Sequence, residues 1–123
     1  MKPKSLTFDM HFAKVECYLI LNRYKADKTL AIDLVNTDGE PITRLTVCAT
    51  PMCLTFNKIY DVAFVDVNNN PSAMQFFEGY KLGKRVKIKG KTVIYTSGFC
   101  EYPLYKFNLN ELRKYAIHDN TKL

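Results

Sequence analysis

The side chains of this sequence that could do chemistry are mostly cations, and they are concentrated in one segment. The chain of 123 residues carries 18 Lys and Arg against 12 Asp and Glu, a formal net charge of +6. Residues 81–91 contain six basic residues and no acidic one, so this segment accounts for the whole excess. The six are Lys81, Lys84, Arg85, Lys87, Lys89 and Lys91. A cluster of this kind suits contact with phosphate groups or with an acidic protein surface.

Within this segment, Lys87 and Lys89 alternate with Val86 and Ile88. The alternation predicts a strand that presents cations on one face and apolar side chains on the other. Two interpretations remain open. The cations could form a ridge that binds the backbone of RNA or DNA, or they could protect a sheet edge from unwanted pairing.

A second candidate contact surface is the cluster Tyr102-Pro103-Leu104-Tyr105. Pro103 lacks a backbone donor, which predicts an edge strand or an irregular strand. Tyr102 and Tyr105 could form a patch that contacts a partner. Alternatively, both rings pack on the core and their hydroxyl groups find hydrogen-bond partners.

Residues 66–70, DVNNN, offer oxygen ligands at alternating positions, as a calcium-binding loop does at its start. Pro71 occupies the sixth position, where such a loop requires Gly, and Phe77 replaces the Glu of the twelfth. We therefore interpret the segment as a turn in which Asn70 caps a helix and Pro71 enters its first turn.

The cysteines and histidines show no spacing typical of a metal site or of a catalytic site. No CxxC pair occurs, so we expect reduced thiols that behave as small hydrophobic residues. A nucleophile formed by Cys100 with His11 or His118 remains conceivable, but no spacing selects it. We expect no catalytic residue, no metal and no cofactor. The four cysteines are Cys17, Cys48, Cys53 and Cys100.

The elements that must position these residues fit one domain over residues 1–123. Hydrophobic residues make up 47% of the chain, enough for a core. No apolar run reaches the roughly 20 residues that span a bilayer. A secretory signal is not evident either, which favours the cytoplasm, or the cytoplasm of a host cell, with no membrane partner.

Period-two alternation and turn residues predict an α+β fold, an antiparallel β-sheet meander with one central helix and a short C-terminal helix. The Asp38-Gly39 pair predicts a hairpin turn. Gly83 is expected to end the central helix, Asn108 or Asn110 to cap the last one, and residues 119–123 to fray. The predicted strands cover residues 6–12, 15–21, 30–34, 42–49, 59–67, 92–95 and 99–107, and the central helix covers 71–81.

Several segments resemble an uncharacterised family of small domains carried on conjugative elements and phages of bacteria. The most specific are Asn68-Asn69-Asn70-Pro71 and the SGFCEYPLYKF motif at 97–107. Shorter matches lie at 38–41, 45–47, 63–67 and 82–84, so that the resemblance covers roughly residues 30–115. It implies an accessory or counter-defence protein and assigns no activity.

Three hypotheses about function follow. The first is an interaction protein of a phage or mobile element that inhibits a host defence system, for example an anti-CRISPR protein that binds a nuclease complex or its guide RNA. The second is a general nucleic-acid-binding module, which rests on the charge. The third is a small nuclease with a site that the sequence does not reveal. The expected partner is thus a host protein or ribonucleoprotein, with RNA or DNA phosphates as contacts.

Overall fold

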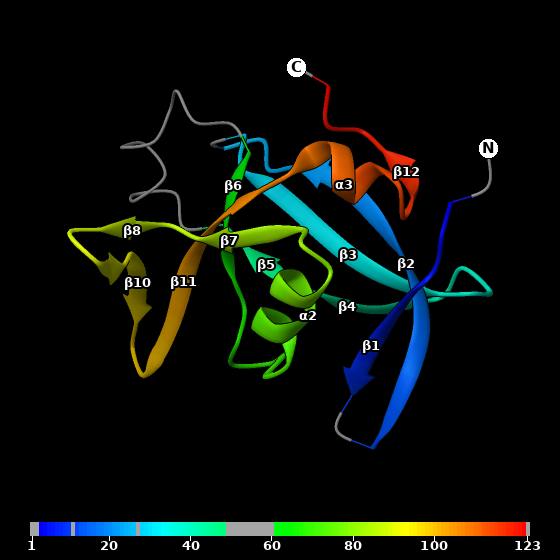
Figure 1. Cartoon of the computed structure of the whole chain (residues 1–123), viewed down its shortest axis with the longest axis horizontal. Coiled ribbons are helices and arrows are strands. Elements are labelled where there is room, and N and C mark those ends of the chain that lie inside the picture. The colour runs from blue at the N-terminus through cyan, green and yellow to red at the C-terminus, as the bar shows by residue number, and fades with distance from the viewer. Residues whose placement is uncertain (1–2, 11, 27, 49–60, 123) are drawn as a thin grey trace.

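The structure is a computed structural model that describes residues 3–10, 12–26, 28–48 and 61–122 (Figure 1). It corrects the predicted fold class, because the protein is mostly β, with 53% strand and 11% helix. In these described ranges the two helices are short, and the strands form two five-stranded sheets and a small two-stranded one. The α+β prediction overestimated the helices, because the two described helices cover only residues 73–79 and 109–113.

The first sheet begins as the predicted antiparallel meander. Strands β1 (Leu6–Met10), β2 (Ala13–Arg23), β3 (Leu30–Asn36) and β4 (Pro41–Arg44) pair in chain order. Gly39 takes φ +86° in the turn between β3 and β4, as the Asp-Gly pair predicts. The last strand, β12 (Ala116–Asp119), then joins β2 in parallel.

The C-terminal segment is therefore held in place, contrary to the expected fraying. Thr121 is buried, and its carbonyl accepts a hydrogen bond of 2.7 Å from Arg23 Nε. The backbone nitrogen of Asn120 donates to the Leu21 carbonyl at 2.8 Å. These long-range contacts could not be read from the polar composition of the segment.

The second sheet has β11 (Cys100–Phe107) at its centre. One edge of β11 pairs with β6 (Val62–Val65), which pairs in turn with β5 (Thr46–Val47). The other edge of β11 pairs with two strands, one after the other along its length. These are β10 (Ile94–Ser97) and β7 (Gly83–Arg85). Pairing across this sheet is antiparallel throughout.

Pro103 lies in this central strand, so the edge strand, one of the two predicted alternatives, was wrong. The backbone nitrogen of Leu104 donates to Val93 on the β10 side, so the nitrogen of the preceding residue faces β6. The ladder with β6 begins only at Leu104. The missing donor of Pro103 is therefore not needed there.

The two sheets are joined at Leu45, inside the segment predicted as one strand over 42–49. The chain leaves the first sheet after β4 and enters the second at β5. Leu45 is fully buried, and its nitrogen donates to the Ile32 carbonyl of β3 at 2.9 Å. The alternating pattern was correct, but it could not show that the strand changes sheets.

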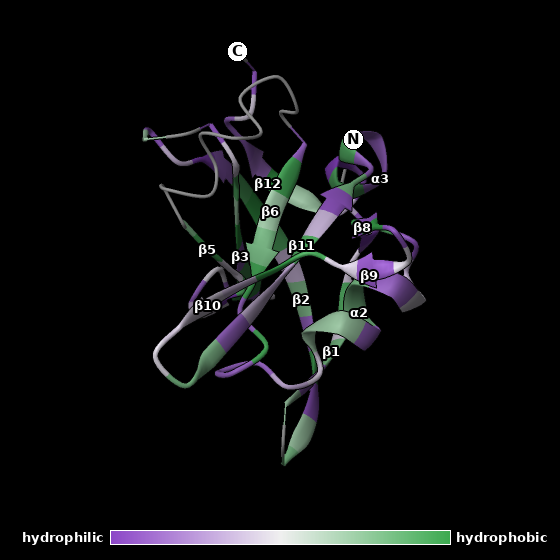
Figure 2. Ribbon diagram, turned by 90° about the vertical axis from the view of Figure 1, so that its left-hand side faces the viewer, coloured by the Kyte–Doolittle hydropathy of each residue, from purple (hydrophilic) through white to green (hydrophobic). Residues whose placement is uncertain are grey.

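The core lies between the sheets and encloses one face of α2 (Ala73–Gly79). Phe76 packs edge-on against Phe8 of β1, and Phe77 packs edge-on against Phe107 of β11. Figure 2 shows the hydrophobic colours of β6, whose four residues are all buried. The helix thus connects the two sheets through aromatic contacts.

The ends of α2 differ from the prediction of a helix over 71–81. Ser72 is the N-cap residue, and its side chain makes no capping bond. The side chain of Asn70 instead bonds to Thr43 at 3.0 Å and to the Arg44 carbonyl at 3.1 Å. Gly83 does not end the helix but lies in β7. The helix α3 (Leu109–Arg113) is capped by Asn108, one of the two predicted caps.

The basic segment is not the single strand that the alternation predicted. After β7, β8 (Lys87–Ile88) and β9 (Lys91–Thr92) form a separate hairpin closed by Lys89 and Gly90. Lys89 therefore lies in a turn and does not share a strand face with Lys87. The Lys89-Gly90 pair acts as a turn signal that competes with the period-two pattern.

Candidate nucleic-acid interface

The β8–β9 hairpin, residues 87–92, forms an arm that extends beyond the second sheet (Figure 1). Lys87, Lys89 and Lys91 are all exposed on it, and Ile88 is 57% exposed. Val86 and Val93 at the base of the arm bond to each other and pack on Phe64 and its neighbours. The arm is therefore anchored at its base and presents three cations to solvent.

The turn of the arm has a conformation that lysine rarely adopts. Lys89 has φ +52° and Gly90 has φ +79°. A two-residue hairpin turn with positive φ at both positions favours Asn-Gly, because Asn tolerates this conformation better than Lys. Backbone preference therefore does not explain the lysine at position 89.

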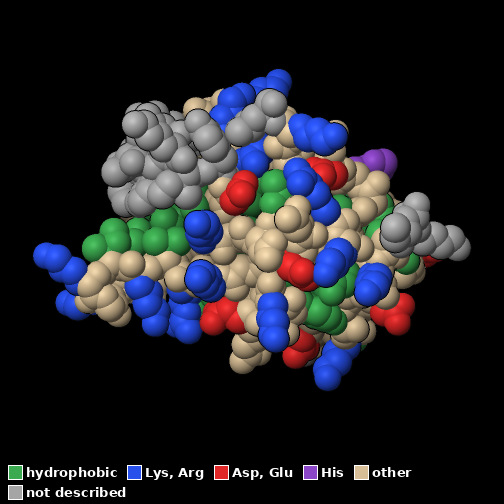
Figure 3. Space-filling model, turned by 45° about the horizontal axis from the view of Figure 1, so that its top comes forward, with side chains coloured by type: hydrophobic (Ala, Val, Ile, Leu, Met, Phe, Trp, Pro, Cys, Tyr) green, Lys and Arg blue, Asp and Glu red, His purple; other side chains and the backbone are tan. Residues whose placement is uncertain are grey.

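Beside the arm, a groove of about 810 Å³ lies between α2, β7, the end of β11 and α3. Figure 3 shows Lys and Arg side chains at the projecting end of the molecule and along the face beside it. The groove is lined by Asp61, Glu78, Lys81, Gly83, Lys84, Lys106, Phe107, Asn108, Leu109, Asn110 and Arg113.

Two lysines of the groove face each other across neighbouring strands. Lys84 of β7 lies directly opposite Lys106 of β11 in the antiparallel register, and both are exposed. Like charges in this position repel and destabilise a sheet. Residues 61–122 contain no ion pair to either lysine, so no carboxylate of that part of the chain offsets the repulsion.

The register that opposes these lysines depends on Gly83. A side chain at this position would place its Cβ 2.7 Å from the Phe107 ring and 3.1 Å from the Lys106 carbonyl. Only glycine allows the two strands to approach this closely over the ring. Gly83 thus serves packing and not the helix end that the sequence suggested.

Lys81 also occupies an unusual backbone position. It has φ +59° just after α2, while the Leu82 nitrogen donates to the Phe77 carbonyl. Helices that end in this way usually place Gly at the left-handed position. Like Lys89, Lys81 is a lysine where the backbone favours another residue.

The two carboxylates of the groove are engaged by other side chains. Asp61 accepts a hydrogen bond from Arg23 at 3.0 Å. Glu78 accepts one from the Tyr105 hydroxyl and lies 3.4 Å from Arg85. Burial, together with this bond to Glu78, raises the pKa of Tyr105 above its ordinary value.

The arginines near the groove are balanced by the same kind of pairing. Arg85 contacts Glu78, and Arg113 Nε donates to Asp119 at 2.7 Å. Although partial burial acts to raise the pKa of Asp119, hydrogen bonds from Thr121 and Arg113 lower it below its ordinary value. The groove therefore offers lysines as its uncompensated cations. Together with those of the arm they form what we call the basic face: Lys81, Lys84, Lys87, Lys89, Lys91 and Lys106.

The predicted site residues comprise five lysines, one arginine and two tyrosines, and the structure places these three kinds of residue differently. The five lysines of segment 81–91 all belong to the basic face, whereas Arg85 is held by Glu78. Tyr105 is fully buried, as the core alternative predicts. Tyr102 is half-buried and stacks on Tyr95, with ring centroids 6.0 Å apart. Neither tyrosine lines the groove.

Sequence reasoning missed Lys106, because it stands alone within the apolar motif at 97–107 and shows no cluster. Its place on β11, one residue before the buried Phe107, does predict an outward side chain once the strand is known. Its opposition to Lys84 depends on strand register and has no local signal.

The asparagine motif has a structural role. Asn69 bonds to the Asp66 carboxylate through its backbone and its side chain, at 3.2 and 2.8 Å. Asn68 donates to the Glu101 carbonyl at 3.1 Å and ties the loop to β11. The interpretation as turn chemistry agrees with these bonds, although the capping role given to Asn70 was wrong.

The thiols and histidines form no cluster in the described part of the chain. Cys17 and Cys100 form no disulfide, and burial raises the pKa of Cys17 to about 11. The described residues contain no group of three or more His, Cys, Asp and Glu side chains that could hold a metal. Cys53 and His11 lie outside the described residues. Nor does any helix in the described ranges have the length and apolarity to cross a membrane.

The fold and the basic face define a β-rich protein with a lysine-lined surface. Residues 18–121 match the model of a family described as a domain of unknown function, DUF4313. Because the match covers most of the chain, the protein belongs to this family, and the resemblance to an uncharacterised domain family is confirmed to that extent. Comparisons with curated proteins and with solved structures found no match.

Proposed function

We propose that the protein binds the phosphate backbone of nucleic acid through its basic face. The observation that carries this proposal is that six lysines, from the arm and the groove, face solvent without a carboxylate partner in residues 61–122. Lysine ammonium groups that replace condensed counterions are the usual source of affinity for a nucleic-acid backbone.

The alternative of an edge guard explains only part of this face. Lysines on the arm could discourage pairing with another sheet. Lys81, however, follows a helix, and Lys106 lies on the central strand of its sheet. These positions need no protection from pairing, so a shared partner accounts for the whole set better.

In its biological setting, we propose an accessory protein of a phage or mobile element that acts in the bacterial cytoplasm. It would inhibit a host defence system without catalysis, as an anti-CRISPR protein does, by binding a nuclease complex or its guide RNA. The basic face supports contact with an RNA of this kind. A general nucleic-acid-binding module would use the same face, and its targets would be free RNA or DNA.

The test of backbone binding is the salt dependence of affinity for a labelled single-stranded RNA and the matching DNA. The logarithm of the affinity should fall against the logarithm of salt concentration with a slope of about −0.7 per phosphate bound. The double variant Lys87→Glu, Lys89→Glu should bind more weakly and flatten the slope by about 0.7 for each phosphate that it no longer binds. Unchanged binding in this variant would exclude the arm from the interface.

A matched control is the double variant Lys4→Glu, Lys14→Glu, which makes the same charge change on exposed lysines in or next to the first sheet. It should keep most of the affinity, because its lysines lie on other elements. If both variants lose binding equally, net charge and not the basic face is responsible. If salt sensitivity persists for a protein target while free RNA and DNA fail to compete, the partner is an acidic protein surface.

The counter-defence setting needs a separate experiment. The protein should retrieve a ribonucleoprotein nuclease from bacterial lysate, and nuclease treatment of the lysate should abolish retrieval if RNA is the contact. RNA and DNA incubated with the protein and Mg²⁺ should remain intact. Cleavage that is lost with one carboxylate substitution would establish the small-nuclease alternative instead.

A further inference from the structure

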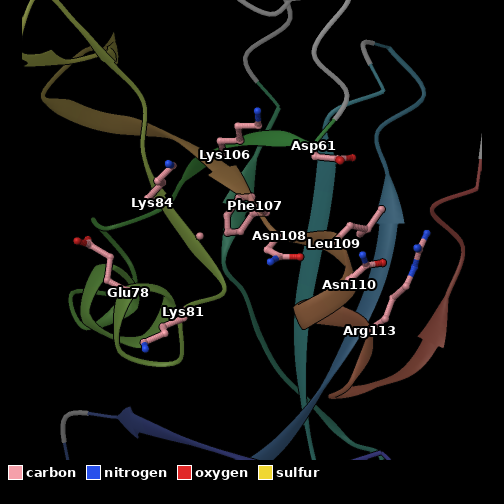
Figure 4. A pocket seen from close by; sticks show the side chains of 11 residues that line it. Asp61, Glu78, Lys81, Lys84, Lys106, Phe107, Asn108, Leu109, Asn110 and Arg113 are labelled. Atoms are coloured by element: carbon pink, nitrogen blue, oxygen red, sulfur yellow. The ribbon is translucent and has the colours of Figure 1, made fainter.

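The groove has two chemically different ends (Figure 4). One end carries Lys81 and Lys84 beside α2 and β7, and Lys106 lies above Phe107. The other end carries the amide side chains of Asn108 and Asn110 on α3 and the residue before it. Phe107 lies between them. A ligand that fills this groove would need an anionic part and a hydrogen-bonding part.

The lysine end is suited to one phosphate group. Residues directly opposite in an antiparallel pair have Cβ atoms about 5 Å apart, so the Lys84 and Lys106 ammonium groups can reach the same anion. A phosphate there would turn the repulsion between them into two charge-assisted hydrogen bonds. Lys81 lines the same groove and adds a third cation.

The amide end offers donors and an acceptor. The side chain of Asn110 is exposed and has no hydrogen bond to another described residue. Asn108 uses its side-chain oxygen to cap α3, at 3.3 Å from the Glu111 nitrogen, which leaves its amide nitrogen available. An asparagine amide can donate and accept at once along the edge of a nucleobase.

The middle and the size of the groove suit a ring. Phe107 is buried and Leu109 half-buried, so both form an apolar floor between the two ends. The volume of about 810 Å³ falls within the roughly 300–1,000 Å³ of small-molecule sites. A nucleobase or ribose can lie on this floor while its polar edge reaches the amides.

We infer that the groove binds a nucleoside phosphate, with the phosphate between Lys84 and Lys106 and the base toward Asn110. This goes beyond backbone binding, because the arm has no part in it. Two kinds of ligand share this chemistry: a free nucleotide and the phosphorylated end of a nucleic-acid strand. Both place one phosphate at the lysines and one base at the amides.

The test measures the affinity of the purified protein for ADP, adenosine and pyrophosphate by calorimetry. ADP should bind at least about tenfold more tightly than adenosine. In the double variant Lys84→Gln, Lys106→Gln, the affinity for ADP should fall at least about tenfold. Asn110→Ala should weaken the binding of ADP and leave the binding of pyrophosphate unchanged. The arm variant Lys87→Gln, Lys89→Gln should leave ADP binding unchanged and serves as the matched control.

The source is identified with two short oligonucleotides that differ only in a 5′-phosphate or a 5′-hydroxyl. A preference for the phosphorylated strand that disappears in the Lys84→Gln, Lys106→Gln variant points to a strand end, and tighter binding of ADP points to a free nucleotide. Equal binding of adenosine and ADP overturns the inference, as does pyrophosphate binding as tight as ADP binding. So does a lack of ADP binding with no preference between the strands.

These outcomes are separate from those of backbone binding. Salt-dependent binding of RNA that requires Lys87 and Lys89, without nucleotide binding, removes the groove inference alone. Nucleotide binding without any affinity for RNA or DNA removes the proposed function alone. Thermal unfolding of the groove variant confirms that it folds, and removal of a like-charge pair should not lower its midpoint.

Discussion

Two cross-strand pairs in this protein have the same geometry and opposite charge patterns. In the first sheet, Asp33 of β3 lies opposite Arg44 of β4, and Arg44 donates to both carboxylate oxygens at 2.6 and 3.0 Å. In the second sheet, Lys84 lies opposite Lys106. The first pair is complete within the fold, whereas the second leaves two cations without a carboxylate partner in residues 61–122.

The surroundings reinforce the difference. Arg44 also lies over the Tyr24 ring, 5.7 Å from its centroid, and the hydrogen bond to Asp33 raises the pKa of the guanidinium. Lys84 and Lys106 instead line a groove with Lys81. Stability accounts for the pair in the first sheet. The pair in the second sheet reduces stability and is consistent with a binding role.

The largest expected effect comes from breaking the register of the like-charge pair. Gly83→Val places a side chain into the Phe107 ring and should lower the free energy of unfolding by about 1–3 kcal/mol. Urea denaturation measures it. Gly79→Ala is the control, because no atom lies within 4 Å of the position that its Cβ would take. Equal stability of Gly83→Val and the wild type would show that the strands do not approach as described.

The second largest effect is expected from removing the opposite-charge pair. Arg44→Ala should lower the free energy of unfolding by about 1 kcal/mol, because Asp33 loses a bidentate partner and Tyr24 loses its cation. The difference from wild type should shrink in high salt. A double-mutant cycle with Asp33→Ala isolates the coupling, and a coupling of zero would contradict the stabilising role assigned to this pair.

Lys106→Glu should change the free energy of unfolding in the opposite direction. It converts the like-charge pair into one resembling Asp33 and Arg44, so it should raise the free energy of unfolding by roughly 0.2–1 kcal/mol at low salt. The same variant should bind RNA and nucleotides more weakly. Thermal unfolding and binding measured on one preparation test both. A variant that is less stable than wild type would indicate that Lys106 has a structural partner.

The smallest effect concerns the arm. Lys89→Asn introduces a side chain that tolerates positive φ better and removes one charge, so stability should rise by a few tenths of a kcal/mol while RNA affinity falls. Thermal unfolding and the salt slope measure the two changes. Lys91→Asn removes the same charge without changing the turn, and it should weaken binding without stabilising the fold.

Local features of the sequence determined a large part of this protein. Period-two alternation located the four antiparallel strands of the first sheet but not β12, because it reports which side chains face a core. Asp38-Gly39 marked a real turn, since Gly39 adopts positive φ. The basic segment 81–91 identified five of the six lysines of the basic face, because composition alone shows where charge is unbalanced.

Only the tertiary structure decided what those features do together. Leu45 sends the chain from one sheet to the other, and β12 returns in parallel to β2, through contacts between residues distant in sequence. The opposition of Lys84 and Lys106 depends on strand register, which Gly83 and the Phe107 ring set by close packing. Alternation determines the face on which a side chain lies, but its partner across the sheet depends on contacts that no local pattern contains.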